Sequence, residues 1–292
     1  MPVLFVALAR PELLTDRPGW GGGLPAYTAL PLDPLSESSS RELAERLLSH
    51  SSLSAEGASA IADMAEGNPL FIEELSASLA EKSTADTGHL PTSIRAIIAA
   101  RLDSLPPGER SVLVDASVVG RVFWRGALAE ILPRDDLAAL LGSLEARDLI
   151  RREAVSRIEG DQQFGFKHGL IHDVAYQTLP RAARRERHAA VARFLEATTA
   201  VGQSHEALGH HWREASEPAR AVEHLTAAAD QAGRGWAKER ASALYGEALE
   251  LIPEADEKRR RELLKRKAVA DVALYHVTDA RRLRQVKPDE AP

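Results

Sequence analysis

The feature that most constrains this chain is a helix corner at Gly67, Asn68 and Pro69. A helical pattern runs up to Glu66, breaks at these three residues and resumes at Leu70. Glycine suits the left-handed residue that closes a helix. Asparagine is a favoured N-cap, and proline at the first helical position already has the required φ. The tripeptide therefore predicts a tight corner between two packed helices.

The composition favours a mainly helical protein. The chain has 292 residues, a formal net charge of −6, 44% hydrophobic residues, 5% aromatic residues and no cysteine. This length allows about two domains or several smaller ones. Without cysteine there can be no disulfide and no thiolate metal site, which suits a reducing compartment. No apolar run has the length of a membrane span and no signal peptide is visible, so a cytoplasmic location and no membrane partner are expected.

Two strands are predicted near the start of the chain. Val3–Ala9 is a continuously apolar run, typical of a strand buried on both faces of a parallel sheet. Ala26–Leu32 is a weaker second strand, ended by Pro34. A parallel sheet of two strands cannot cover itself, so Val3–Ala9 is expected to expose an apolar edge. Residues 1–35 are therefore interpreted as the incomplete C-terminal strands of a larger α/β core.

Residues 36–105 are predicted to form a small helical unit that contains the corner. N-cap serines precede the first helical pattern, and Pro106-Pro107-Gly108 ends the last one. The three helices after the first are expected at Ser54–Glu66, Pro69–Lys82 and Pro91–Leu105.

Residues 106–180 show the order of a winged helix, which is three helices followed by a β-hairpin. The hairpin strands, Leu149–Ser156 and Gln162–Lys167, flank a turn at Glu159-Gly160-Asp161. The helices are expected at Glu109–Val119, Trp124–Leu132 and Asp135–Asp148. Winged helices often bind DNA through the third helix, but here acidic residues outnumber the single Arg147. DNA binding is therefore not expected, and a structural or regulatory role is favoured.

Residues 181–292 are predicted to form helical hairpins with a polar tail. Ala241, Tyr245, Ala248 and Pro253 match the second half of a tetratricopeptide repeat (TPR), although the tryptophan-leucine-glycine pattern of the first half is missing. The basic run from 258 to 267 is interpreted as a solvated helix face. The fold class is thus mainly α, with an α/β remnant, a helical lid, a winged helix and TPR-like hairpins.

Two motifs resemble those of the signal-transducing P-loop ATPases called STAND NTPases. The stretch 67–75, Gly-Asn-Pro-Leu-Phe-x-Glu-Glu-Leu, looks like their lid motif, and 166–176, Phe-x-His-x-Leu-Ile-x-Asp-Val-Ala-Tyr, looks like a second signature. The resemblance implies that Pro69, with Asn68 beside it, lies against the adenine of bound nucleotide. It also implies that Arg10 senses the terminal phosphate and that His168 touches the β-phosphate of ADP.

Each of these residues also has a simpler interpretation. Arg10 would then be a solvated arginine at a strand end. His168 would cap a helix, or pair with His172 four residues on as zinc ligands, for which no third ligand is evident. In the STAND relatives an aspartate follows the histidine, whereas this chain has Gly169.

No catalytic constellation is visible in the sequence. The Gly-x-x-x-x-Gly-Lys-[Ser/Thr] loop and the acidic magnesium-binding strand of P-loop ATPases are missing, as is a Gly-x-Ser-x-Gly elbow. His205 and His210 are five residues apart, so they do not share a helix face as zinc ligands would. Catalysis and a metal site are therefore not expected from this chain alone, and ATP or ADP is expected as a cofactor only together with the missing core.

The resemblance covers roughly residues 2–253 and implies the C-terminal part of a bacterial STAND protein. Such a protein acts as a nucleotide-dependent switch and binds a protein partner through its repeats, and close relatives often carry a class III adenylate or guanylate cyclase domain. Two alternatives stay open: a stand-alone helical-repeat scaffold that does not use nucleotide, and a fragment of a LuxR-type transcriptional regulator.

Overall fold

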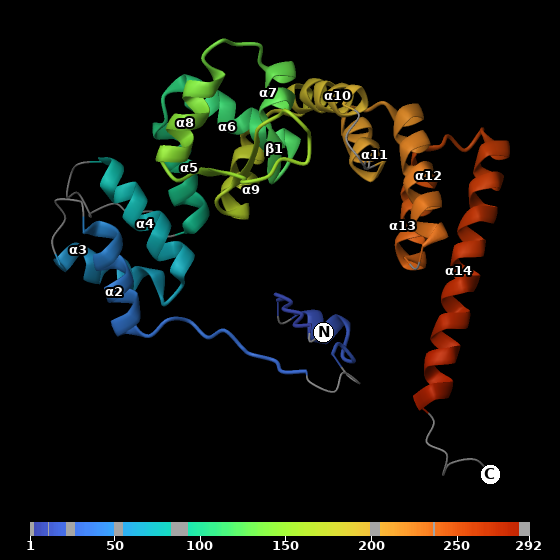
Figure 1. Cartoon of the computed structure of the whole chain (residues 1–292), viewed down its shortest axis with the longest axis horizontal. Coiled ribbons are helices and arrows are strands. Elements are labelled where there is room, and N and C mark those ends of the chain that lie inside the picture. The colour runs from blue at the N-terminus through green and yellow to red at the C-terminus, as the bar shows by residue number, and fades with distance from the viewer. Residues whose placement is uncertain are drawn as a thin grey trace. The chain divides into compact units, whose positions relative to one another are not determined.

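The computed structural model confirms a mainly helical protein (Figure 1). It describes residues 3–10, 12–21, 27–49, 55–82, 93–198, 205–235 and 237–285. Contacts between residues divide the chain into two compact units, Met1–His89 and Leu90–Pro292. Among the helices in the described ranges, none is both long and apolar enough to cross a membrane.

The two strands predicted near the start of the chain are not formed. Residues 3–9 and 27–32 are irregular, and Ala26 lies outside the described residues. Phe5 is 90% exposed and its apolar neighbours are similarly exposed. A strand needs a hydrogen-bonded neighbour, and the described part of the chain supplies none for this segment. The first element here is instead a short helix, α1 (Glu12–Asp16).

Three helices build the rest of the first unit. These are α2 (Glu37–Leu48), α3 (Ala55–Ala65) and α4 (Pro69–Lys82), and α2 packs against both of the others. Ser36 caps α2 by accepting a hydrogen bond from the amide of Ser39 at 3.2 Å. The core of the unit is aliphatic and includes the buried side chains of Ala44, Leu48, Ile61, Ile72 and Leu75.

The predicted corner between α3 and α4 is confirmed. Gly67 has a φ of 78°, the left-handed conformation that closes a helix. Its carbonyl accepts a hydrogen bond from the amide of Leu35 at 2.8 Å, so the segment before α2 is tied to the corner. Asn68 Oδ1 accepts from the amide of Leu70 at 3.1 Å, and Pro69 begins α4. Each of the three residues therefore has the local role that its type predicts.

The second unit begins with five helices around a small sheet. The helices are α5 (Ile94–Ser104), α6 (Pro107–Val119), α7 (Arg125–Ile131), α8 (Leu137–Ala146) and α9 (Gly169–Thr178). The strands β1 (Val122–Trp124), β2 (Ile150–Arg152) and β3 (Gln163–Phe166) form an antiparallel sheet in the order β1-β3-β2. We call α5 to α9 with this sheet the helix-and-sheet domain.

This domain has the order of helices and hairpin that the sequence predicts. The predicted helices correspond to α6, α7 and α8, and the predicted hairpin to β2 and β3. Phe123 lies opposite Phe164 in the sheet, and their rings stack with centroids 5.7 Å apart inside the core. Helix α5, which lies within the predicted lid of residues 36–105, packs against α9 and belongs to the second unit.

Five further helices follow as hairpins (Figure 1). They are α10 (Arg181–Ala197), α11 (His205–Glu214), α12 (Pro218–Arg234), α13 (Lys238–Leu251) and α14 (Glu257–Gln285), and each packs against the next. Gly209 allows α11 to approach α12 closely, because a Cβ there would lie 2.7 Å from Cγ of Leu225. Ala241 and Ala248 are fully buried between α12 and α14, as the TPR-like pattern predicts.

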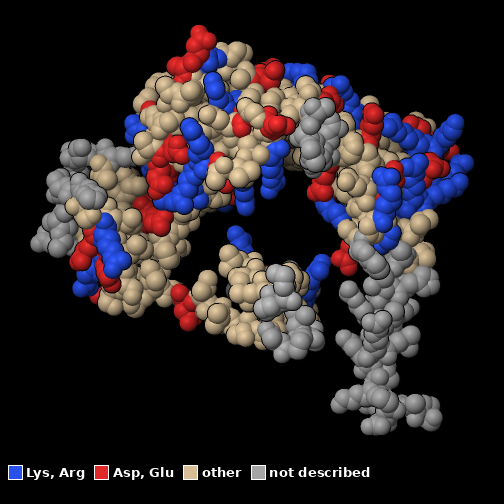
Figure 2. Space-filling model, in the orientation of Figure 1, with Lys and Arg blue, Asp and Glu red and all other residues tan. Residues whose placement is uncertain are grey.

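The basic run on α14 lies on the surface, as predicted. Figure 2 shows a cluster of Lys and Arg side chains over the first part of this helix. Arg266 pairs with Asp230 of α12 at 3.0 Å and Lys267 pairs with Asp271 at 2.8 Å. The pair between Arg266 and Asp230 therefore connects α14 to α12, whereas Lys267 and Asp271 both belong to α14.

Candidate functional site

The residues predicted from the resemblance lie in both compact units. Arg10 is exposed just before α1, and its carbonyl accepts a hydrogen bond from the amide of Leu13 at 3.0 Å. Asn68 and Pro69 are exposed at the start of α4. His168 is half-buried directly before α9 in the second unit, and its side chain does not cap that helix. Their common contact with one nucleotide stays a prediction.

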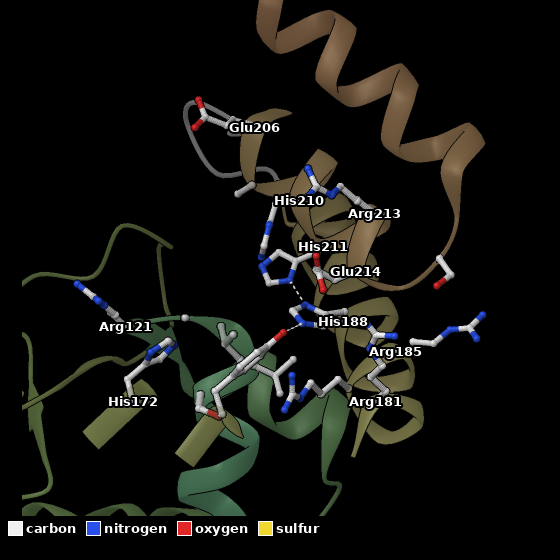
Figure 3. A pocket seen from close by; sticks show the side chains of 18 of the residues that line it. Arg121, His172, Arg181, Arg185, His188, Glu206, His210, His211, Arg213 and Glu214 are labelled. Atoms are coloured by element: carbon white, nitrogen blue, oxygen red, sulfur yellow. Dashed lines mark hydrogen bonds between the residues drawn. The ribbon is translucent and has the colours of Figure 1, made fainter. Parts of the chain in front are cut away.

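A different site is visible within the second unit. It is a cavity of about 1230 Å³ whose walls come from the end of α6, from α9 and α10, and from α11, α12 and α13. We call it the junction cavity, because it lies where the helix-and-sheet domain meets the hairpins. Its polar lining is rich in histidine and arginine (Figure 3).

The lining of the junction cavity is positively charged. Six arginines and three glutamates line it, which gives a net charge of +3 with neutral histidines, in a chain whose formal net charge is −6. The charged residues are Arg121, Arg181, Arg184, Arg185, Arg213, Arg240, Glu206, Glu214 and Glu247.

On the side of α11 and α13, the charges neutralise one another. Arg240 lies 2.5 Å from Glu206 and 3.6 Å from Glu247, and Arg213 lies 3.4 Å from Glu247. These pairs tie α11 to α13. They also leave little unbalanced charge on this wall of the cavity.

On the side of α10, one arginine has a structural role and two do not. Arg184 donates to the carbonyl of Leu179 at 2.8 Å and lies over the ring of Tyr176 at 4.5 Å. Arg181 and Arg185 are exposed and four residues apart, so they share a helix face. Neither side chain forms a hydrogen bond or ion pair with another described residue. Two guanidinium groups on one face are thus open to a ligand.

A third arginine borders the cavity from the turn between α6 and β1. Arg121 has a side chain that is 67% exposed and lies 3.6 Å from Asp173. It passes over the start of α9, where a Cβ on Gly169 would lie 3.2 Å from its Cζ. Gly169, at which the sequence departs from the STAND pattern, thus leaves room for this guanidinium.

Two buried histidines lie at the centre of the site (Figure 3). Nδ1 of His188 on α10 is 2.9 Å from Nδ1 of His211 on α11, and Nε2 of His188 is 3.0 Å from the hydroxyl of Tyr176. Only one of two facing Nδ1 atoms can carry the proton of their hydrogen bond, so the pair requires at least one neutral ring. The chain of three side chains connects α9, α10 and α11.

The surroundings of this pair favour the neutral forms. Burial lowers the pKa of His188 to about 4, and the nearby His210 and Arg184 act in the same direction. Burial also lowers the pKa of His211 well below its usual value, with His188 and His210 contributing. Both rings are therefore uncharged hydrogen-bonding groups at neutral pH.

The motif at 166–176 contributes two residues to the junction cavity, but not the histidine that the resemblance implied. His172 and Tyr176 from this motif line it, whereas His168 does not. The hydrogen bond from His172, 2.8 Å away, is the main cause that lowers the pKa of Asp173. Within the described part of the chain, no group of three or more His, Cys, Asp or Glu side chains could hold a metal ion.

Sequence reasoning did not find the α10 and α11 residues of this cavity. The signals that could have indicated them are the run of basic residues from Arg181 to Arg187 and the adjacent pair His210-His211. Neither spacing corresponds to a known motif, and only the packing of α10 against α11 brings them together.

Comparisons with known proteins give limited matches. Residues 36–85, which span α2 to α4, match a family described as a domain of unknown function (DUF8739). No significant match is found among curated proteins. Among solved structures, the chain is similar to a Signal Transduction ATPase with Numerous Domains (STAND) protein with a tetratricopeptide repeat sensor from Pyrococcus horikoshii. The identity is 16% and the TM-score 0.48, over 87% of this chain and 41% of that protein, so the chain spans about two fifths of its length.

Proposed function

We propose that this chain is the regulatory part of a STAND-type signalling protein whose helical hairpins bind a protein partner. The observation that carries the proposal is the serial packing of α11 to α14, in which each helix packs against the next. Stacked hairpins of this kind present an extended surface suited to recognising another protein. The site residues contain no catalytic constellation, which favours regulation over catalysis for the chain by itself.

The proposal includes control by nucleotide. The exposed Asn68 and Pro69 at the start of α4, together with Arg10 and His168, would contact ATP or ADP held by a P-loop core. The phosphate contacts of Arg10 and His168 are each worth about 1–3 kcal/mol, typical of charge-assisted hydrogen bonds. In this proposal ADP favours a closed form, and exchange for ATP frees the hairpins for the partner. A class III nucleotide cyclase is the proposed effector in the full-length protein.

The experiment measures ADP affinity in the protein complete with its nucleotide-binding core. His168→Ala and Arg10→Ala are each expected to weaken ADP binding about tenfold, and Pro69→Ala to weaken adenine binding with the fold intact. Pro107→Ala is the matched control, because Pro107 also begins a helix, α6, but has no proposed contact with nucleotide. If His168→Ala and Arg10→Ala both leave the affinity unchanged, the nucleotide switch is wrong and a scaffold that does not use nucleotide replaces it.

A further inference from the structure

We propose that the junction cavity binds a small anion that carries several phosphate groups. This site is distinct from the nucleotide contacts proposed above, because Arg10, Asn68, Pro69 and His168 do not line it. The residues that form it all belong to the second compact unit.

The arginines provide the charge that such a ligand needs. Arg181 and Arg185 form no ion pair with the other described residues, and Arg121 forms one, with Asp173 at 3.6 Å, on a side chain that is 67% exposed. A guanidinium donates two parallel hydrogen bonds to phosphate oxygens, which makes arginine well suited to this class of ligand. In Figure 3 the side chains of Arg181 and Arg185 lie on one side of the histidine pair and Arg121 on the other. Cations thus border the cavity on two sides of the histidine pair.

A further hydrogen-bonding side chain lies beside the histidine pair. His210 is exposed at the cavity and next to the buried pair of His188 and His211, with ring centroids 5.8 Å and 5.4 Å away. An imidazole N–H can donate to a phosphate oxygen. The hydrogen bond between His188 and His211 fixes the positions of these rings before any ligand binds. Such preorganisation lowers the cost of binding.

The carboxylates of the lining oppose an anion only weakly. Glu206 and Glu247 already pair with Arg240 and Arg213. Glu214 on α11 also lines the cavity and raises the pKa of Tyr176, after burial as the main cause. Glu214 is therefore the residue whose neutralisation is expected to strengthen anion binding.

The lining of the site favours a compact anion over an acidic peptide. The volume of about 1230 Å³ lies above the usual range of about 300–1,000 Å³ for small-molecule pockets, so the size of the cavity does not select the ligand class. Peptide recognition generally uses an open strand edge, an apolar groove or an aromatic-lined channel. The lining consists mainly of charged and histidine side chains drawn from several helices, which is none of these.

Calorimetric titration of the whole chain with sodium tripolyphosphate tests the proposal. At about 0.1 M salt, where exposed charges are screened beyond about 10 Å, specific binding is expected to persist. The double variant Arg181→Gln/Arg185→Gln is expected to weaken it about a hundredfold, since each of the two charge-assisted contacts is worth close to a factor of ten. Glu214→Gln is expected to tighten it severalfold. The matched control is Arg193→Gln, because Arg193 is exposed on the same helix but does not line the cavity.

Three further titrations identify the ligand class. ATP is expected to bind about as well as tripolyphosphate and to lose binding in the same double variant, whereas adenosine is expected not to bind. Absence of tripolyphosphate binding at about 1 mM, where even a weak site of about −4 kcal/mol would be half filled, overturns the proposal. Equal weakening by Arg193→Gln also overturns it. Tighter binding of a hexaglutamate peptide than of tripolyphosphate would replace the small anion by an acidic protein segment.

Discussion

Acidification is expected to destabilise the second unit through the buried pair of His188 and His211. Both rings are neutral in the folded protein, with exposed fractions of 1% and 5%. In the unfolded chain each has the ordinary histidine pKa of about 6.5 and takes up a proton as the pH falls. Their folded pKa values are lowered, so protons bind preferentially to the unfolded chain. Stability is thus fully present above about pH 6.5 and is lost as the pH falls towards the folded pKa.

The magnitude follows from the pKa of His188, which is about 4 in the folded protein. Between about pH 7 and pH 5 the unfolded ring becomes almost fully protonated while the folded ring stays neutral, which costs about 2 kcal/mol. His211, with a pKa well below its usual value, contributes a similar amount over the same range. The pair together is therefore expected to lower the free energy of unfolding by about 4 kcal/mol.

Other shifted groups act differently over this range. The pKa values of Asp136 and Asp271 are lowered, mainly by hydrogen bonds from Arg134 and Lys267. The stability that their ionised forms contribute is therefore lost only at lower pH. Burial raises the pKa of Asp115, which has the opposite effect, because protonation of its folded form favours the folded state as the pH falls. Comparison with a variant that lacks only the histidine pair removes these common contributions.

Urea denaturation at about pH 7 and pH 5 measures the effect, followed by tryptophan fluorescence to which the buried Trp212 contributes. The double variant His188→Leu/His211→Leu is expected to lose most of the pH dependence. Tyr176→Phe is the control, because it removes the hydrogen bond to His188 without removing either histidine and should cost about 1 kcal/mol at both pH values. An equal pH dependence in the wild type and in the double leucine variant would refute the reasoning.

Three further predictions concern stability. Gly67→Ala should lower the free energy of unfolding by about 1–3 kcal/mol, because Gly67 has positive φ and a Cβ would lie 2.5 Å from the carbonyl of Leu35. Gly142→Ala, in a helix with open space around the new methyl group, should instead stabilise by about 0.5–1 kcal/mol, and thermal melting distinguishes the two. Arg187→Met should cost about 3–5 kcal/mol in urea denaturation, because it leaves the buried Asp115 without its cation. If Asp115→Asn does not recover most of that loss in the double variant, the ion pair is not the cause.

The sequence predicted the helices well because their signals are local. The corner from Gly67 to Pro69 is an example, since each residue fixes its own backbone geometry or caps the next turn. Val3–Ala9 fails as a strand because a continuously apolar run forms a strand only where neighbouring strands exist to pair with it. The order of helices and hairpin strands after Pro106 was also predictable, because helix caps and turn residues are local signals.

The junction cavity was not predictable from local signals. Arg185 and His188 come from α10, His211 from α11 and Tyr176 from α9. These residues meet through tertiary packing, and no fixed spacing in the sequence encodes their distances. The sequence analysis identified the motif at 166–176, which contains Tyr176. The resemblance, however, implied a nucleotide contact for His168, which does not line this cavity.

Anion binding and protonation should act on the junction cavity together. A bound polyphosphate favours the charged form of nearby histidines, so it raises the pKa of His188 and His211, and protonation in turn strengthens anion binding. Tripolyphosphate at about a hundred times its dissociation constant stabilises the folded state by about 2.7 kcal/mol at a given pH. The terminal phosphates of the ligand also take up a proton near pH 6, which weakens its binding to any variant at about pH 5. Because the affinity of the wild type rises as its histidines become charged, its increase in melting temperature at about pH 5, relative to that at pH 7, should exceed the same ratio in the double leucine variant. An equal ratio in the two proteins would separate the histidine pair from the anion site and contradict their coupling.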